Sequence, residues 1–269
     1  MRISVITVCF NAEKTIEDTI RSVLCQDYND FEYIIKDGLS TDSTLIIAEK
    51  YKSEFESKDI TYRIFSGSDS GIYDAMNIAA GYAEGEWVIY LNSGDRFFDD
   101  SVLNKLDKEI TDEYGVIYGD VALYDRGFYK SLKSGELDDF KYTNPICHQG
   151  VLTKTDIVRD FRFDTDYNIA ADFDLYLRIN KSSKYRFKKN PLTVAVYRFD
   201  GLSNNNVLKR EKEFDLSRKN AGIKRVKIVE LLIIKNVFVY SLRSFLIRVL
   251  GNCFYTKFNG WYTDKSLLK

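Results

Sequence analysis

The sequence has little histidine and proline, and its cysteines follow no pattern. Its 269 residues include one histidine, two prolines and four cysteines, and no two cysteines form a Cys-x-x-Cys pair. Such scattered cysteines predict neither a zinc site nor a disulfide framework, which fits a reducing cytoplasm. A serine hydrolase would have to use His148 as its base, and the Gly-x-Ser-x-Gly elbow of such enzymes is absent.

The chain also lacks an excess of charge of one sign. Its 39 basic and 40 acidic residues give a formal net charge of −1, and the first 200 residues hold no long basic stripe with interleaved aromatic residues. We therefore expect no nucleic-acid partner. The chain starts directly with the strand-like run RISVITVCF, without a charged leader and a cleavage site, so secretion is not expected.

Glycine-rich phosphate loops are missing as well. No Gly-x-Gly-x-x-Gly follows the first predicted strand, and the P-loop pattern is absent. These absences exclude dinucleotide-binding Rossmann and P-loop proteins and count against a nucleotidyltransferase. A nucleotide bound by this chain would need another partner for its phosphates, and a divalent cation held by one or two carboxylates is such a partner.

Apolar strand-like runs and helical patterns alternate in the first half of the chain. The predicted strands are Ile3–Phe10, Phe31–Lys36, Ile60–Ser66 and Trp87–Leu91. The predicted helices are one that Asn11 caps, one over Leu45–Phe55 and one over Tyr73–Ala83. This alternation predicts an α/β fold, in which helices flank a mostly parallel sheet.

Each predicted strand ends in polar or glycine residues. The strand tips carry Asn11 and Glu13, Asp37 and Gly38, residues 69–71, and residues 92–95. In open parallel sheets, ligands bind beyond the carboxyl ends of the strands. The sequence therefore predicts a binding site at this edge, with Asp42 capping a helix nearby rather than binding a ligand.

The second half of the chain is less regular. We expect a strand over Gly115–Leu123, an irregular region, a helix over Ala171–Asn180 and a strand over Leu192–Tyr197. From Asn204 the chain looks helical, and residues 224–250 are basic and apolar together, with Lys235 interrupting any bilayer span. An interfacial membrane helix and a helix packed on the main domain or on a second subunit both stay open.

Two long stretches carry a resemblance to a known family. ISVITVCFNAEKTIEDTIRSVLCQDYNDFEYIIKDGLSTDST and SGIYDAMNIAAGYAEGEWVIYLNSGDRF resemble the family 2 glycosyltransferases of the bacterial surface-polysaccharide type. These are inverting enzymes with the GT-A fold that use nucleotide sugars. The resemblance is strong over residues 1–110, weaker at HQGVLTKTDIV and NIAADFDLYLRI, and ends near Ser203. It implies a GT-A domain over residues 1–203, with a nucleotide-sugar half (1–110) and an acceptor half (111–203), followed by a helical extension over 204–269.

The resemblance assigns roles to the strand tips. Asp37 matches an aspartate that contacts the nucleotide base, and SGIYDAMN matches a segment that lies along the donor. Leu39 and Met76 depart from the family pattern, which usually has a small residue and an arginine at these places. The implied donor-binding residues are Thr7, Cys9, Asn11, Glu13, Asp37, Gly38, Gly71, Asp74, Asn77, Asn92, Ser93 and Gly94.

LNSGD occupies the place of the family's Asp-x-Asp motif. Asn92 and Gly94 stand where aspartates are common, so Asp95 alone keeps a carboxylate for Mg²⁺ or Mn²⁺. AADFDL matches the motif that carries the catalytic base, which implies Asp172 in that role, with Asp174 the weaker candidate. His148 and Gln149 are candidates for contact with substrate, and a structural role stays open for His148. Ordinary turn or capping roles stay open for Asp37, Asp95 and Asp172.

The resemblance implies a metal-dependent glycosyltransferase of the hexosyltransferase type. A UDP-sugar is the favoured donor, and the expected acceptor is a saccharide, lipid-linked in the assembly of lipopolysaccharide, capsule or another surface polysaccharide. We expect a cytoplasmic protein with peripheral contact to the inner face of the membrane, and self-association stays open. The alternative is a non-catalytic protein of the same fold that binds nucleotide sugars or polysaccharide.

Overall fold

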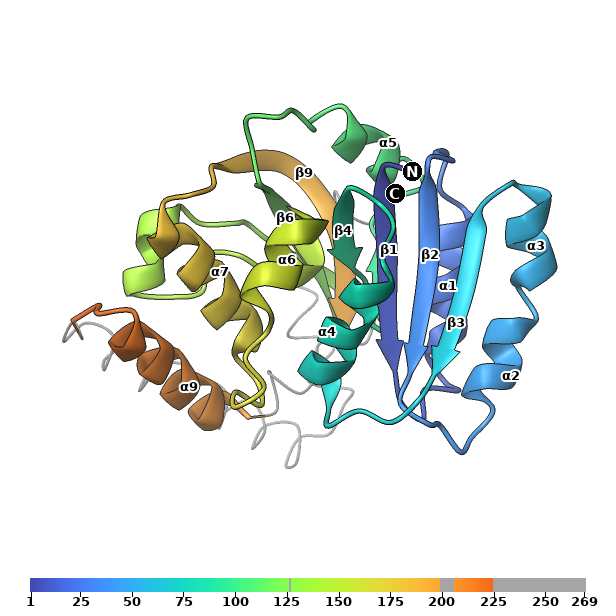
Figure 1. Cartoon of the computed structure of the whole chain (residues 1–269), viewed down its shortest axis with the longest axis horizontal. Coiled ribbons are helices and arrows are strands. Elements are labelled where there is room, and N and C mark those ends of the chain that lie inside the picture. Colours follow the sequence, from blue (N-terminus) through green and yellow to red (C-terminus); the bar gives the residue numbers. More distant parts are fainter. Residues whose placement is uncertain (126, 199–205, 225–269) are drawn as a thin grey trace.

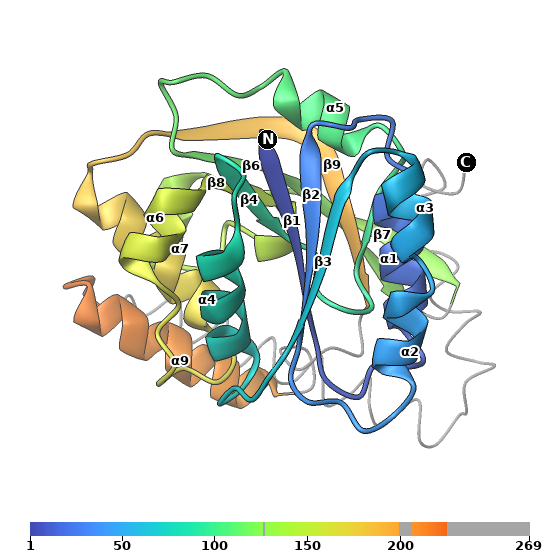
Figure 2. The same ribbon diagram turned by 45° about the vertical axis from the view of Figure 1, so that its right-hand side comes forward.

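The computed structural model describes residues 1–125, 127–198 and 206–224. They form a curled mixed sheet with helices on both faces (Figures 1 and 2). The strand order is β3-β2-β1-β4-β8-β6-β9-β5, and β7 pairs with β6. Strands β1 to β4 run parallel to one another, as the alternation of patterns in the first half predicts.

The first half holds the four parallel strands β1 to β4, the helices between them, the short strand β5 and helix α5. Its elements are β1 (Ile3–Cys9), α1 (Ile16–Leu24), β2 (Phe31–Asp37), α2 (Thr44–Glu49), α3 (Lys52–Ser57), β3 (Thr61–Ser66), α4 (Ile72–Tyr82), β4 (Trp87–Tyr90), β5 (Arg96–Phe97) and α5 (Val102–Asp107). The second half supplies β6 (Val116–Asp125), β7 (Phe128–Leu132), η1 (Leu137–Lys141), η2 (His148–Gly150), β8 (Val151–Lys154), α6 (Thr155–Phe161), α7 (Ala171–Ser182), β9 (Phe187–Arg198) and α9 (Val207–Asn220).

The carboxyl ends of β1, β2, β3 and β4 all point to the lower edge of the sheet in Figure 1. The register places Cys9 of β1 beside Asp37 of β2, and Asp37 beside Ser66 of β3. Beyond β4, the N–H of Ser93 still donates to the carbonyl of Val8 at 3.3 Å, so the loop after β4 stays next to β1. The predicted strand tips therefore do meet at one edge.

Two predictions in the first half are wrong. The expected helix over residues 45–55 is the pair α2 and α3, because the chain tightens into i→i−3 hydrogen bonds at Lys50 and Tyr51. At this break, the hydroxyl of the buried Tyr51 donates a hydrogen bond to Oε1 of Glu17 at 2.6 Å. Asn11 does not cap α1, whose N-cap is Thr15. Instead Asn11 has a positive φ of 48°, and its amide oxygen accepts the N–H of Thr41 at 2.9 Å.

The irregular region of the second half contains more regular structure than its sequence indicates. The four residues of β8 run antiparallel between β4 and β6 and so join the two halves of the sheet. Helix α6 follows directly and lies on the same face as α4 and α7 (Figure 1). A strand of only four residues carries too little periodicity to stand out from a loop.

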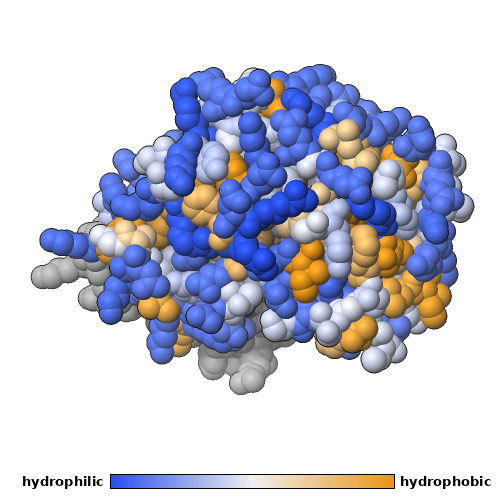
Figure 3. Space-filling model, in the orientation of Figure 1, coloured by the Kyte–Doolittle hydropathy of each residue, from blue (hydrophilic) through white to orange (hydrophobic). Residues whose placement is uncertain are grey.

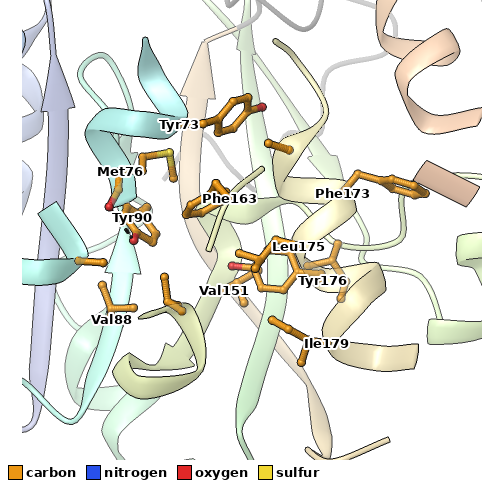
Figure 4. Packing of buried hydrophobic residues seen from close by; sticks show 14 of the residues in the cluster. Tyr73, Met76, Val88, Tyr90, Val151, Phe163, Phe173, Leu175, Tyr176 and Ile179 are labelled. Carbon is orange, nitrogen blue, oxygen red and sulfur yellow. Dashed lines mark hydrogen bonds between the residues drawn. The ribbon is translucent and has the colours of Figure 1, made fainter. Parts of the chain in front are cut away.

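The hydrophobic core has one part on each face of the sheet. On the α1 side it includes Ile16, Ile20, Tyr33, Phe55 and Trp87, all without exposed surface. On the α4 side, Met76 and Tyr90 lie where α4 packs on β4, with the rings of Tyr73 and Phe163 next to them, whereas Phe173 points away on the far side of α7 (Figure 4). The outer surface in the view of Figure 3 is mostly hydrophilic, with small scattered apolar patches.

Helix α9 follows the predicted change to helical structure after Asn204 and lies against α7 (Figure 1). Its Phe214 ring lies 4.4 Å from the Phe173 ring, centroid to centroid. The basic and apolar helices expected up to residue 250 lie outside the described residues from position 225 onward. Within the part of the chain that is described, no helix is long and apolar enough to span a bilayer.

Candidate active site

A line of polar contacts joins the two halves of the chain at the carboxyl edge of the sheet. Nδ2 of Asn92, just beyond β4, lies 3.3 Å from Nε2 of His148 in η2. Nδ1 of the same imidazole lies 3.1 Å from Oδ2 of Asp172 in the first turn of α7. Beside this line, Nε2 of Gln149 donates to Oδ2 of Asp95 at 3.2 Å. The structure thus brings together all five of these residues, which the sequence proposes from three separate motifs.

Helix α1 holds the loop of residues 92–95 in place. The Thr19 hydroxyl donates to the carbonyl of Asp95 at 2.7 Å and accepts the N–H of Gly94 at 2.9 Å. The hydroxyls of Thr15 and Ser93 lie 3.0 Å apart. Gly94 has φ 98°, a conformation that L side chains rarely adopt, so glycine suits this place better than the family's aspartate.

Sequence reasoning missed Thr19, although a signal was available. Thr19 lies on the apolar stripe of α1, three residues after Ile16 and one before Ile20, and it is fully buried. A polar side chain in such a stripe needs a hydrogen-bond partner in the core. Here those partners are the backbone groups of the loop that carries Asp95.

Asp95 is 8% exposed, and burial raises the pKa of its carboxyl to about 6. The charge of His148 and the hydrogen bond from Gln149 act in the opposite direction but do not outweigh the burial. A carboxylate in this position is poorly solvated when ionised, and a nearby cation would favour its charged form.

His148 is held between an amide and a carboxylate. Burial opposes protonation of its imidazole, but the hydrogen bond to Asp172 and the charges of Asp172 and Asp95 outweigh burial and raise the pKa of His148 above its ordinary value. The two side chains of the His148–Asp172 pair are 15% and 14% exposed. The pair is therefore largely buried but still reachable from solvent.

Asp37 orders the loop after β2. Its Oδ2 accepts the N–H of Ser40 at 3.0 Å and the hydroxyl of Ser66 at 2.7 Å. Asp37 therefore does stabilise the turn after β2, the ordinary structural role that the sequence allows for it. Its Oδ1 faces the Cys9 thiol at 3.8 Å, and burial together with the charge of Asp37 raises the pKa of that thiol to about 12. Asp37 has no exposed surface, and its contact with a nucleotide base stays a prediction.

The first two strand tips are tied to each other. Besides the bond of Asn11 to Thr41, the Glu13 carboxylate accepts the N–H of Ser43 at 3.2 Å. Asp42 accepts the N–H of Thr44 at 3.0 Å at the start of α2, although the N-cap residue of that helix is Ser43. Gly38 approaches Asp69 so closely that an added Cβ would lie 3.0 Å from Oδ2 of Asp69. These contacts shape one continuous loop surface beside β1 and β2.

The predicted donor segment around α4 divides into surface and core residues. Gly71 has φ 130°, and Asp74 accepts the N–H of Ser70 at 2.9 Å at the start of the helix. Asn77 instead bonds through both amide atoms to the backbone of Phe163, at 2.8 and 2.9 Å. Thr7, also buried, donates to the carbonyl of Leu91 at 2.6 Å. Asn77 and Thr7 therefore hold the protein's own backbone, and their donor contacts stay predictions.

The residues at the β4 tip fit a cation that takes most of its ligands from elsewhere. Asp95 supplies one carboxylate, and Oδ1 of Asn92 is buried without a hydrogen-bond partner. No group of three or more His, Cys, Asp or Glu side chains that could hold a metal occurs among the residues described. Mg²⁺ is commonly bound in this way, by one or two carboxylates together with water and substrate phosphates.

The curled sheet with helices on both faces is the GT-A fold of glycosyltransferases. The family model "Glycosyl transferase family 2" matches residues 4–231, and the chain belongs to that family. A PGL/p-HBAD biosynthesis glycosyltransferase of Mycobacterium bovis BCG is 28% identical over 215 residues, which cover 78% of this chain and 81% of that protein. The chain is accordingly a glycosyltransferase.

Two other proteins extend the comparison. The poly(ribitol-phosphate) β-N-acetylglucosaminyltransferase TarS of Staphylococcus aureus is 37% identical over 97 residues, 35% of this chain and 16% of TarS. The structure of TarS residues 1–349 with UDP-GlcNAc aligns with a TM-score of 0.65 at 18% identity, covering 84% of this chain and 68% of that one. The mannosyltransferase PcManGT of Pyrobaculum calidifontis, with GDP-Man and Mn²⁺, aligns with a TM-score of 0.66 at 16% identity, covering 99% and 81%. These structural likenesses show the fold.

Proposed function

We propose that the chain transfers a sugar from a nucleoside-diphosphate donor to a saccharide acceptor with inversion at the anomeric carbon. The observation that carries this proposal is the line Asn92, His148, Asp172, which links the tip of β4 to the start of α7. It joins the loop of Asp95, where the leaving diphosphate would lie, to a carboxylate from the acceptor half. Inverting transfer needs these two functions together, a cation-supported leaving group and a base for the attacking hydroxyl.

Asp172 is the proposed base. Its Oδ1 accepts the N–H of Phe173 at 2.8 Å, and its Oδ2 lies next to Nδ1 of His148. A neutral imidazole that donates Nδ1–H to Asp172 accepts a hydrogen bond from the Asn92 amide at Nε2, so both contacts are satisfied in one tautomer. The imidazole then orients the carboxylate, which removes the proton from the acceptor hydroxyl as that oxygen attacks the sugar.

Asp95 is the proposed ligand of Mg²⁺ or Mn²⁺, and a cation next to it would stabilise the ionised form of this carboxyl, whose pKa burial raises. When bound, the metal neutralises charge on the leaving diphosphate. Gln149 orients the Asp95 carboxylate, while Thr19 fixes the backbone behind it. The Mn²⁺ in the PcManGT structure gives this proposal further support.

A UDP-sugar is the proposed donor, supported by the UDP-GlcNAc bound to TarS. The donor would lie along the loop surface formed by Asn11, Glu13 and Gly38 and along the segment from Gly71 to Asp74. Asp37 is the proposed carboxylate that contacts the nucleotide base, with Cys9 beside it at the end of β1. Ser93 and Gly94 would border the diphosphate next to Asp95.

The proposed acceptor is a saccharide in surface-polysaccharide assembly. The name of TarS gives poly(ribitol-phosphate), a sugar-alcohol polymer, and so supports only the broader idea of a polymeric acceptor. A lipid linkage, peripheral contact with the membrane, self-association and the boundary near residue 204 rest on the sequence alone and stay proposals.

The experiment is a panel of UDP-, GDP- and TDP-sugars, with release of nucleoside diphosphate measured with and without EDTA. We expect turnover with a UDP-sugar that EDTA abolishes and excess Mn²⁺ restores. The Asp95→Ala variant should lose about 100-fold or more of that turnover, because metal support of the leaving group contributes several kcal/mol. Asp166→Asn is the matched control, since Asp166 is exposed. Turnover that ignores EDTA, or a fully active Asp95→Ala variant, would rule out the metal assignment.

A further inference from the structure

The turn that leads into α7 is held from outside by helix α9. The consecutive backbone N–H groups of Asn168, Ile169 and Ala170 donate to the Glu213 carboxylate at 3.2, 2.8 and 3.0 Å. Glu213 is only 9% exposed. Hydrogen bonds to an ionised carboxylate are shorter and roughly twice as strong as neutral ones. One side chain of α9 therefore fixes the backbone that ends two residues before Asp172.

Helix α7 has no N-cap side chain of its own that could fix the turn before it. Its N-cap is Ala170, which carries no polar side chain and makes no side-chain capping bond. Helix N-termini favour a nearby carboxylate, both as an acceptor for free N–H groups and as a negative charge facing the helix dipole. Glu213 accepts the N–H of the N-cap residue Ala170 and of the two residues before it, so another element places a carboxylate next to the start of α7. Within the described part of the chain no basic side chain forms an ion pair with Glu213, so the turn is its partner.

Helix α9 is itself firmly attached to α7. Phe214 packs on Phe173, the Ser217 hydroxyl donates to Oδ1 of Asp174 at 2.8 Å, and Nε of Arg218 donates to the carbonyl of Phe140 at 2.8 Å.

On the opposite side of the turn, the Tyr73 hydroxyl of α4 donates to the carbonyl of Ile169 at 2.6 Å. The turn is thus clamped between α4 and α9.

We propose that Glu213 is a positioning residue that sets the place of Asp172, so that the C-terminal helix α9 is part of the catalytic unit. This inference rests on the proposed function, in which Asp172 is the base. Glu213 does not touch Asp172. It acts through the backbone of residues 168–170, and without it three N–H groups lose their acceptor and the start of α7 can move away from His148.

The single histidine of the chain offers a direct test. Protein labelled selectively at histidine, expressed without a histidine tag, gives one imidazole signal set that needs no assignment. Because Asp172 raises the pKa of His148, a carboxylate that moves away should lower it. The pKa of His148 would be measured by NMR in the wild type, in Glu213→Gln, which keeps the length but offers one acceptor oxygen, and in Ser217→Ala, which removes a different bond between α9 and α7.

We expect Glu213→Gln to lower the pKa of His148 by about one unit. Nucleoside diphosphate release from the best donor of the panel should fall roughly ten- to hundredfold, because small displacements of a catalytic group have effects of this size. In Glu213→Gln the Kd for UDP should change less than about twofold. The control Ser217→Ala should lose about as much Tm as Glu213→Gln but keep the pKa of His148 and the turnover near their wild-type values. A pKa and a turnover in Glu213→Gln that match Ser217→Ala would overturn the proposal.

Two further variants keep the proposal testable if Glu213→Gln does not fold or if Asp172 is not the base. If Glu213→Gln does not fold, Glu213→Asp shortens the side chain by one methylene and should shift both quantities in the same direction by less. Asp172→Asn separates this inference from the proposed function. Full turnover in Asp172→Asn would refute the base assignment, whereas a lowered pKa of His148 in Glu213→Gln would still support Glu213 as the residue that places the pair.

Discussion

Asp37 is proposed to bind the donor nucleotide and Asp172 to act as the catalytic base. The two residues come from different halves of the chain, and the protein holds them in different ways. Asp37 is fixed by Ser40 in its own loop and by Ser66, its partner in the register of the adjacent strand. The turn before Asp172 is fixed by Tyr73, 96 residues away from its partner Ile169, and by Glu213, 43 to 45 residues from the N–H groups that it accepts. The proposed donor residue is thus positioned by the parallel sheet, whereas the proposed base is positioned by helices from distant parts of the chain.

The loop of residues 92–95 offers the strongest test of this difference. It comes directly after strand β4 of the sheet, but hydrogen bonds of Thr19 in helix α1 hold it in place. Thr19→Val removes the hydroxyl that bonds Gly94 and Asp95, and the unpaired backbone groups should cost about 1–3 kcal/mol of stability. Turnover should fall at least roughly tenfold as Asp95 shifts. Thr19→Ser keeps the hydroxyl and is the control. Equal turnover in the two variants would show that the sheet alone places this loop.

A second prediction concerns the stability cost of Asp95. Its folded-state pKa of about 6 exceeds the ordinary 3.8, so the metal-free folded protein loses stability as pH rises through that window. Asp95→Asn lacks this titration and should be more stable than the wild type in EDTA. We expect a gain of about 3 kcal/mol at pH 8 and about half of that at pH 5, measured by urea unfolding. A gain that does not depend on pH would contradict the burial of an ionisable carboxyl.

The third prediction has the smallest effect and concerns the contact between the halves. Asn92→Asp restores the acid common in the family and places a carboxylate where the amide now lies 3.3 Å from Nε2 of His148. The new negative charge should raise the pKa of His148 further, which the single imidazole signal would report. An unchanged pKa would mean that Asn92 and His148 are not in contact in solution.

The first half of the fold could be predicted closely from the sequence. Parallel strands buried on both faces read as continuous apolar runs, and each ends where polar residues begin, so β1 to β4 lie within a residue or two of their predicted bounds. The break between α2 and α3 was missed because it depends on Tyr51 entering the core, which the periodicity of the segment does not reveal.

The candidate site could be predicted residue by residue but not as an arrangement. His148 and Asp172 lie 24 residues apart across an irregular region, so nothing in the sequence indicated their contact or the contact of His148 with Asn92. Glu213 lies in the run KREKEFDLSRKN, where the buried carboxylates of Glu211 and Glu213 look like exposed charges. Only the packing of α9 on α7 distinguishes it.

The most direct measurement pairs the Kd for UDP with the saturated rate of nucleoside diphosphate release in two matched variants. Asp37→Asn should weaken UDP binding about tenfold and leave the saturated rate within about threefold of wild type, because its effect lies in donor binding. Asp172→Asn should leave the Kd near wild type and lower the rate about 100- to 10,000-fold, the range typical of a general base. A rate retained in Asp172→Asn, or both variants weakening UDP binding equally, would contradict a division of the site into a donor half and a base half.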